Sequence, residues 1–187
     1  MKHSWKPGTL VYPAPAVLVT CGDQERNNLF TVAWTGTICT NPAMLSISVR
    51  PERYSYGLIK DNMQFTVNLT TSAMARATDL CGVKSGADCD KWELTGLHRY
   101  KGQSVECPAV EESPISIECR VKSILPLGSH DMFIAEVTNI LADDRYLDPE
   151  SGRFDLERAG LMSYSHGAYY AQGPILGTFG FSVKRKK

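Results

Sequence analysis

"LFTVAWTGTICTNPAMLSISV", residues 29–49, contains two runs with the alternating polarity of β-strands, the first over 29–39. In this first run, Val32, Trp34 and Gly36 are expected on one face of a single strand. The large ring of Trp34 is followed by small residues, so this face leaves a gap beside its largest side chain. Two interpretations stay open: a planar ligand occupies the gap, or Gly36 marks a β-bulge and a side chain of another strand fills it.

Strand patterns recur along the whole chain and are joined mostly by short connections. Besides 29–39, strands are expected at 16–21, 44–49, 64–69, 115–121 and 132–141. This density of strands favours an antiparallel β-barrel over a layered α/β sheet. At 187 residues the chain is predicted to form a single, mainly β domain over residues 1–187.

A few short helices are expected between the strands, at 55–62, 71–82 and 90–96. Ser55 is expected to cap the start of the first helix, because a serine hydroxyl accepts a hydrogen bond from a free N–H group. Gly82 is expected to end the second helix, because glycine tolerates the left-handed conformation found after a last turn.

Charge and hydropathy exclude several classes of partner. The sequence has 20 Lys plus Arg against 20 Asp plus Glu, so no overall field indicates nucleic acid or an anionic membrane. The basic tail at 183–187 is interpreted as a solvated chain end. The N-terminus lacks the apolar region of a signal peptide, and no apolar run approaches the ~20 residues of a membrane span. We therefore expect a soluble, cytoplasmic protein.

Six cysteines are spread along the chain: Cys21, Cys39, Cys81, Cys89, Cys107 and Cys119. None forms a CxxC pair and no two share a ligand spacing with a nearby His, so no metal site is predicted. They are interpreted as reduced thiols, most of them buried. Cys39 keeps two interpretations, a redox-active thiol near the gap or a small residue packed in the barrel wall.

Arg50, Arg53 and Ser55 surround the expected helix start at 55. Two guanidiniums, a hydroxyl and the free N–H groups of a helix N-terminus suit a phosphate, although solvated surface arginines and a simple cap explain the same residues. A planar-ring site and a phosphate site on one chain indicate a nucleotide-like cofactor. His130, after a Gly-Ser turn, is either structural or a hydrogen-bonding partner of that cofactor.

Three segments together resemble the flavin reductase-like family of FMN-binding split-barrel proteins, most closely its flavoredoxin branch. Residues 27–69, "NNLFTVAWTGTICTNPAMLSISVRPERYSYGLIKDNMQFTVNL", resemble the leading motif of the family. Residues 128–137, "GSHDMFIAEV", resemble its second motif, and residues 169–187, "YYAQGPILGTFGFSVKRKK", resemble the usual ending of the branch. The resemblance implies an antiparallel split β-barrel that binds FMN without a covalent bond.

The resemblance also implies which positions contact the flavin. The implied contacts to the ring and ribityl chain are Asn28, Trp34, Thr35, Gly36, Thr37, Cys39, Thr40 and Asn41. Ser55 and Arg53 match the phosphate site, Lys91 matches a lysine that reaches the flavin, and His130 matches the family histidine. The segment 162–170 matches one that closes over the flavin, through Ser163, Tyr164 or His166. Such sites commonly form at the two-fold interface of a homodimer.

The resemblance implies an electron-transferring function with several forms left open. No GxGxxG motif is present, so NAD(P)H would stack its nicotinamide directly on the flavin rather than sit in a Rossmann domain. One form is an NAD(P)H-dependent flavin reductase, with a nicotinamide or a free flavin as its small-molecule partner. The second is a carrier that exchanges electrons with a redox protein partner. The third is a barrel without flavin that binds a phosphate-containing ligand.

Overall fold

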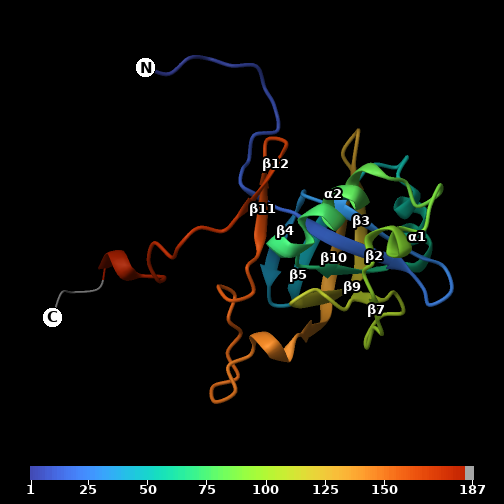
Figure 1. Cartoon of the computed structure of the whole chain (residues 1–187). Coiled ribbons are helices and arrows are strands. Elements are labelled where there is room, and N and C mark those ends of the chain that lie inside the picture. The colour runs from blue at the N-terminus through green and yellow to red at the C-terminus, as the bar shows by residue number, and fades with distance from the viewer. Residues whose placement is uncertain (184–187) are drawn as a thin grey trace.

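The computed structural model describes residues 1–183, and within them short helices are set around β-strands (Figure 1). The strands are β1 (Ala14–Pro15), β2 (Val17–Gly22), β3 (Asn27–Val32), β4 (Thr35–Thr40), β5 (Ala43–Val49), β6 (Gln64–Asn68), β7 (Arg99–Tyr100), β8 (Ala109–Val110), β9 (Ile115–Pro126), β10 (Asp131–Ala142), β11 (Met162–Ser165) and β12 (Ala168–Ala171). The helices are α1 (Tyr54–Asn62), α2 (Ala75–Val83) and α3 (Lys91–Thr95), with short 3₁₀ turns η1 (Ser72–Met74), η2 (Asp144–Tyr146) and η3 (Phe181–Val183).

The main sheet is antiparallel and has seven strands in the order β3-β2-β6-β9-β10-β5-β4. β3 and β4 are its two edges, yet only Ala33 and Trp34 separate them along the chain. Three residue steps span at most about 11 Å, so the two edges must meet at this corner. The Ser48 N–H of β5 donates to the Trp34 carbonyl at 2.9 Å and fixes the corner. The sheet therefore curls into a split barrel, which confirms the predicted fold class.

The prediction of one strand over 29–39 is wrong. The chain leaves the pairing with β2 at Val32 and begins a pairing with β5 at Thr35, so the run is divided between opposite edges of the sheet. The change of partner turns the Trp34 side chain out of the barrel core, and it is 44 % exposed. The alternating pattern does not reveal this break, because both halves alternate and only the strands that they pair with differ.

Two apolar clusters hold the barrel together. The larger fills its interior with side chains of β2, β3, β5, β6, β9 and β10, such as Phe65 and Phe133. The smaller lies outside the sheet and includes Leu18, Met74 and Trp92 under α2 and α3. Because successive residues of β2 point alternately into one cluster and the other, this strand is buried along its whole length.

Two helix-end predictions are wrong, although the three expected helices are present with short shifts of their ends. Arg53 is the N-cap of α1, and Ser55 lies inside the first turn, buried, without capping it. α2 continues to Val83 with Lys84 as its C-cap, so Gly82 does not end it. Gly82 instead lies against β3, where a Cβ would meet Thr31 at 3.3 Å. Close helix–sheet packing therefore explains this glycine.

Both ends of the chain leave the barrel on one side (Figure 1). β1 pairs with β11, and β11 with β12, in a separate three-stranded sheet whose hairpin turns at His166 and Gly167, with φ of 47° and 88°. Beyond this sheet, residues 1–11 and 172–183 extend away from the barrel. Of the basic tail at 183–187, the structure describes Val183, which is exposed. Residues 184–187 lie outside the described residues. Among the residues that the structure describes, no helix is long and apolar enough to cross a membrane.

Candidate functional site

Two adjoining pockets lie at the corner where β3 gives way to β4. We name the first, about 450 Å³ in volume, the aromatic pocket and the second, about 420 Å³, the cationic pocket. The residues that line both are Phe30, Thr31, Arg50, Arg53 and Gly82, so the pockets are continuous. The aromatic pocket is also lined by Tyr12, Ala16, Val32, Ala33, Trp34, Ser48, Val49, Asp79, Val83, His130, Tyr164, Gly167 and Tyr169. The cationic pocket is also lined by Asn28, Glu52, Tyr54, Ser55, Cys81, Lys84, Ser85, Gly86 and Lys91.

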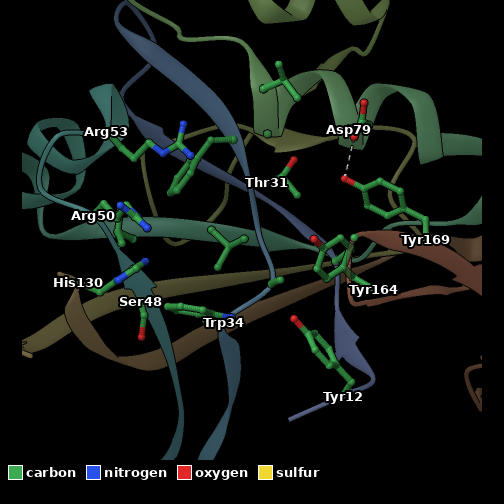
Figure 2. A pocket seen from close by; sticks show the side chains of 18 residues that line it. Tyr12, Thr31, Trp34, Ser48, Arg50, Arg53, Asp79, His130, Tyr164 and Tyr169 are labelled. Carbon is green, nitrogen blue, oxygen red and sulfur yellow. Dashed lines mark hydrogen bonds between the residues drawn. The ribbon is translucent and has the colours of Figure 1, made fainter. Parts of the chain in front are cut away.

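Aromatic rings form two sides of the aromatic pocket (Figure 2). On one side the Tyr164 ring lies edge-on to Tyr12 and to Tyr169, with centroids 6.3 Å and 5.4 Å apart. On the other side the Trp34 and His130 rings lie 4.5 Å apart. Flat apolar walls of this kind suit a planar ring held between them.

His130 is a neutral hydrogen-bonding group in this wall. Burial, and next the positive charge of Arg50, lower the pKa of His130 below its ordinary value. Its Nδ1 lies 3.0 Å from the Ser129 hydroxyl, which leaves Nε2 for a ligand. The imidazole therefore offers the aromatic pocket a polar group without a net charge near neutral pH.

The N-terminus of α1 contributes positive potential to the cationic pocket. Arg53 is in an extended conformation at the N-cap, its side chain forms no capping hydrogen bond, and the first turn contains no acidic residue. The positive end of the helix thus has no anionic side chain of its own. The pocket-lining cations are Arg50, Arg53, Lys84 and Lys91, against the single carboxylate of Glu52. The exposed Arg50–Glu52 contact, at 3.4 Å, neutralises little of this charge.

Lys91, the first residue of α3, is the least usual group in the site. It is only 3 % exposed, and its ammonium donates to the Cys81 carbonyl at 2.8 Å. None of the ion pairs formed by the described residues includes it. Burial lowers the pKa of Lys91, because the charged form loses its hydration. A buried ammonium is normally paired with an anion, so this pocket is built for one.

Asn28 positions the Ser55 hydroxyl at the same pocket. The Asn28 side-chain amide donates to Ser55 Oγ at 2.7 Å, and both side chains are buried. Ser55 accepts this bond, and its hydroxyl also forms a hydrogen bond with the Cys21 side chain, so both contacts fix its position at the pocket. Gly86 packs against the pair so closely that a Cβ there would lie 2.3 Å from Asn28 Oδ1. The close approach of the Gly86 backbone therefore keeps Asn28, and through it Ser55, in place.

Comparison with known proteins identifies this arrangement. The sequence profile of the flavin reductase like domain matches residues 9–171, a range that includes every residue lining the two pockets. The chain belongs to the flavin reductase like family. The resemblance found in the sequence is thereby confirmed, and the two pockets lie within the flavin reductase like domain.

Solved structures in this family resemble the chain over nearly its whole length. The flavoredoxin of Desulfovibrio vulgaris (Miyazaki F) is 30 % identical, with a TM-score of 0.90 over 98 % of this chain and 100 % of the other. The flavoredoxin of Methanosarcina acetivorans is 26 % identical, with a TM-score of 0.89 over 98 % of this chain and 100 % of the other. Among the curated relatives, an NADPH-flavin oxidoreductase of Streptomyces viridifaciens is 25 % identical over 67 % of this chain and 64 % of its own length.

The structure brings together part of the site that the family resemblance implies. The implied residues that line the two pockets are Asn28, Trp34, Arg53, Ser55, Lys91, His130 and Tyr164. Those of β4 and its following turn lie outside both pockets: Thr35, Gly36, Thr37, Cys39, Thr40 and Asn41. Ser163 lines a smaller pocket beside β1, and His166 lies at the hairpin tip, 6.2 Å from the Tyr12 ring. Flavin contacts by these residues stay a prediction.

The gap beside Gly36 is open in the single chain. A Cβ built at Gly36 would have no described atom within 4 Å, so no side chain of another strand fills the gap. The irregular pairing of β4 with β5 falls between Thr37 and Cys39, after Gly36. In the single chain, therefore, neither a bulge at Gly36 itself nor a side chain in the gap is found, and occupation of the gap by a ligand stays a prediction.

Several pocket residues were not expected from the sequence, notably Tyr12, Asp79 and Tyr169. The Tyr169 hydroxyl donates to Asp79 at 3.2 Å, and burial together with Asp79 raises the pKa of Tyr169 to about 12. The run "SHGAYY" held a usable signal, because a residue followed by Gly between short alternating runs predicts a tight hairpin turn. Tyr12 carries no comparable signal, since its place depends on pairing between opposite ends of the chain.

Proposed function

We propose that the chain binds FMN without a covalent bond and uses it to move electrons. It would do so as an NAD(P)H-dependent flavin reductase-like oxidoreductase or as a flavoredoxin that passes electrons from reduced FMN to an acceptor. The observation that carries the proposal is the buried Lys91 ammonium, which has no anionic partner among the described side chains and faces a pocket continuous with an aromatic one. FMN has the matching two parts, a phosphate and a planar ring.

The cationic pocket fits the phosphate. Arg53 offers a planar set of N–H donors, Ser55 a hydroxyl, and the first turn of α1 its free backbone N–H groups. Lys91 and Lys84 also line the pocket and add positive charge. A phosphate here would relieve the uncompensated charge of Lys91, so each partner stabilises the other.

The aromatic pocket fits the ring. Trp34 supplies flat apolar surface for one face of the ring, and His130 supplies a neutral polar group. When bound, FMN supplies one- and two-electron transfer, which side chains do not perform. The residues of the chain orient the ring, exclude water from one face and tune its environment through nearby charge and hydrogen bonds.

NAD(P)H is the proposed donor, with the name of the Streptomyces NADPH-flavin oxidoreductase as support. The flavoredoxin names of the two structural neighbours support the alternative, a carrier between redox proteins. Stopped-flow mixing of the flavin-loaded protein with NADH and with NADPH separates the two. Bleaching by either nicotinamide supports the reductase, whereas bleaching by reduced ferredoxin alone supports the carrier.

A homodimer is proposed as the working assembly. The extended segments at 1–11 and 172–183 carry large apolar side chains that are more than half exposed, among them Trp5, Leu176 and Phe179. The edge strand β4 is also unpaired on its outer side in the single chain. A second copy would cover both features and bring further groups to the open side of Trp34. Light scattering coupled to size-exclusion chromatography measures the mass that tests this.

The first test of the function is the visible spectrum of the freshly purified protein, followed by chromatography of the compound that heat releases. A flavin spectrum with FMN released supports the proposal. A colourless protein that stays colourless after incubation with FMN would contradict it and favour a barrel that binds another phosphate-containing ligand.

A further inference from the structure

Two phenol groups of the aromatic pocket have no role in the site as described so far. Tyr12 precedes β1 and Tyr164 lies in β11, and both side chains are half-buried. Figure 2 shows both hydroxyl oxygens directed toward the space beside Trp34. Within residues 1–183 neither hydroxyl takes part in a hydrogen bond, in contrast to Tyr169, which is held by Asp79. Two free donors therefore converge on one space.

The surroundings of the two phenols define what they can recognise. The Tyr12, Tyr164 and Tyr169 rings form a continuous edge-to-face wall, with neighbouring centroids 6.3 Å and 5.4 Å apart. The carboxylate of Asp79, on this wall, accepts a hydrogen bond from the Tyr169 hydroxyl. The arginines of the pocket lie on the far side, toward α1 (Figure 2). Among the described residues that line the aromatic pocket, the arginines lie on the other side, and this side thus offers flat apolar surface and hydroxyl donors. It suits an uncharged planar ring that carries an oxygen acceptor.

We propose that the tyrosine side of the aromatic pocket is the subsite of the electron acceptor, and that it takes planar aromatic carbonyl compounds of the quinone class. Tyr12 and Tyr164 donate hydrogen bonds to the carbonyl oxygens of the acceptor. This rests on the proposed function, because the two electrons come from FMN reduced by its donor. According to this proposal, the electron acceptor is a small molecule rather than a redox protein.

The reduction balances with these groups. A quinone takes up two electrons and two protons and leaves as the hydroquinone. The C=O bonds become C–O bonds, and one new O–H bond forms at each oxygen. Tyr12 and Tyr164 give up their hydroxyl protons as the charge develops on the acceptor oxygens, and the phenolates regain protons from water through the partly open side of the pocket. Hydrogen-bond donors placed in advance stabilise that developing charge.

The double variant Tyr12→Phe/Tyr164→Phe tests the proposal, since phenylalanine keeps the rings and removes only the hydroxyls. The matched control is Tyr170→Phe on the same hairpin, because Tyr170 is 53 % exposed and does not line the pocket. Flavin-loaded protein is reduced anaerobically and mixed with duroquinone, which needs protons, or with ferricyanide, which does not. Duroquinone is fully substituted and so does not alkylate the cysteines.

The expected result is a fall of at least about tenfold in the ratio of the duroquinone rate to the ferricyanide rate in the double variant. The control variant should keep the ratio of the original protein. An unchanged ratio, or loss of FMN from the double variant, would overturn the proposal, the latter because the phenols would then bind the cofactor. The single variants Tyr12→Phe and Tyr164→Phe replace the double one if it does not fold.

A binding measurement gives a second readout that needs no turnover. Isothermal titration of the oxidised, flavin-loaded protein with 4-hydroxyacetophenone, an aromatic ketone that an oxidised flavin does not reduce, measures the affinity of the subsite. We expect the dissociation constant to rise about fivefold or more in the double variant and to stay unchanged in Tyr170→Phe. Equal affinities with FMN still bound would refute the subsite alone, whereas a protein that binds no FMN would refute the proposed function.

Discussion

Replacement of Lys91 by methionine should weaken FMN binding without weakening the flavin-free fold. The side chain is 3 % exposed, and among the described residues its ammonium donates a hydrogen bond to the Cys81 carbonyl at 2.8 Å. Methionine fills a similar volume, so the neighbouring side chains keep their packing. Removal of the ammonium loses that charge-assisted hydrogen bond, worth about 1.5–3 kcal/mol, but also removes the desolvation cost of a buried charge without an anionic partner. The two effects oppose each other, and the flavin-free protein should unfold at nearly its original temperature.

The effect on the loaded protein is different, because a bound phosphate would lose its charged neighbour. A hydrogen bond to a charged group contributes about 1.5–3 kcal/mol, which corresponds to a dissociation constant raised roughly 10- to 100-fold. Quenching of flavin fluorescence measures the dissociation constant, and thermal unfolding of the flavin-free protein measures stability. Lys101→Met, at an exposed lysine outside both pockets, is the matched control. An FMN affinity unchanged in Lys91→Met, or an equal loss in the control, would refute the reasoning.

Four further predictions concern the site and its supports. Ser55→Ala combined with Arg53→Ala should raise the dissociation constant of FMN by at least about tenfold, and undiminished binding would show that the phosphate lies elsewhere. Gly86→Ala should weaken FMN binding by displacing Asn28, whereas Gly57→Ala, on the exposed side of α1 with no atom within 4 Å of its Cβ, should stabilise the fold by about 0.5–1 kcal/mol in chemical denaturation. Because the pKa of His130 is lowered in the fold, the imidazole is neutral in both states above the ordinary value of 6.5, and it destabilises the fold as the pH falls from there through the folded pKa. The difference in melting temperature between the original protein and His130→Asn should therefore shrink from about pH 8 to about pH 5, and a constant difference would contradict it. Cys39→Ala should retain FMN and reductase turnover, and loss of electron transfer with flavin still bound would identify a redox-active thiol.

Local alternation predicted most strands of the barrel but not where its edges meet. Residues 29–32 and 35–39 both alternate, so nothing in the pattern marks Ala33 and Trp34 as a corner. The break arises because the first half pairs with β2 and the second with β5. Partner choice depends on residues distant in sequence, and a short window cannot contain it.

Prediction of the site from local sequence has the same limit, because it also depends on residues distant along the chain. Ser55 has the features of a cap in the sequence, yet Asn28, 27 residues earlier, holds it inside the first turn. The family resemblance supplied Asn28 and Lys91, which no local pattern singles out, and the structure places both on the cationic pocket. The place of Tyr12 in the pocket depends on its contact with Tyr164, near the other end of the chain. Neither the periodicity nor the quoted motifs predict this contact.

The tyrosine wall is attached to the barrel by few bonds, and this separates its energetics from those of the core. The small sheet that carries the wall contacts the rest of the chain through the isolated Thr71–Leu161 bridge and the Tyr169–Asp79 hydrogen bond. The Met162 N–H also donates to the Thr70 carbonyl, and the Ser72 N–H donates to the Gly160 carbonyl. A unit held so lightly opens at a free energy below that of global unfolding, so its amides should exchange hydrogen long before those of β2 or β6. Anything that binds between the wall and Trp34 would first slow exchange in the hairpin and leave the barrel unchanged. The protein thus carries two cooperative units of unequal stability, and the weaker one would control how long an occupant stays.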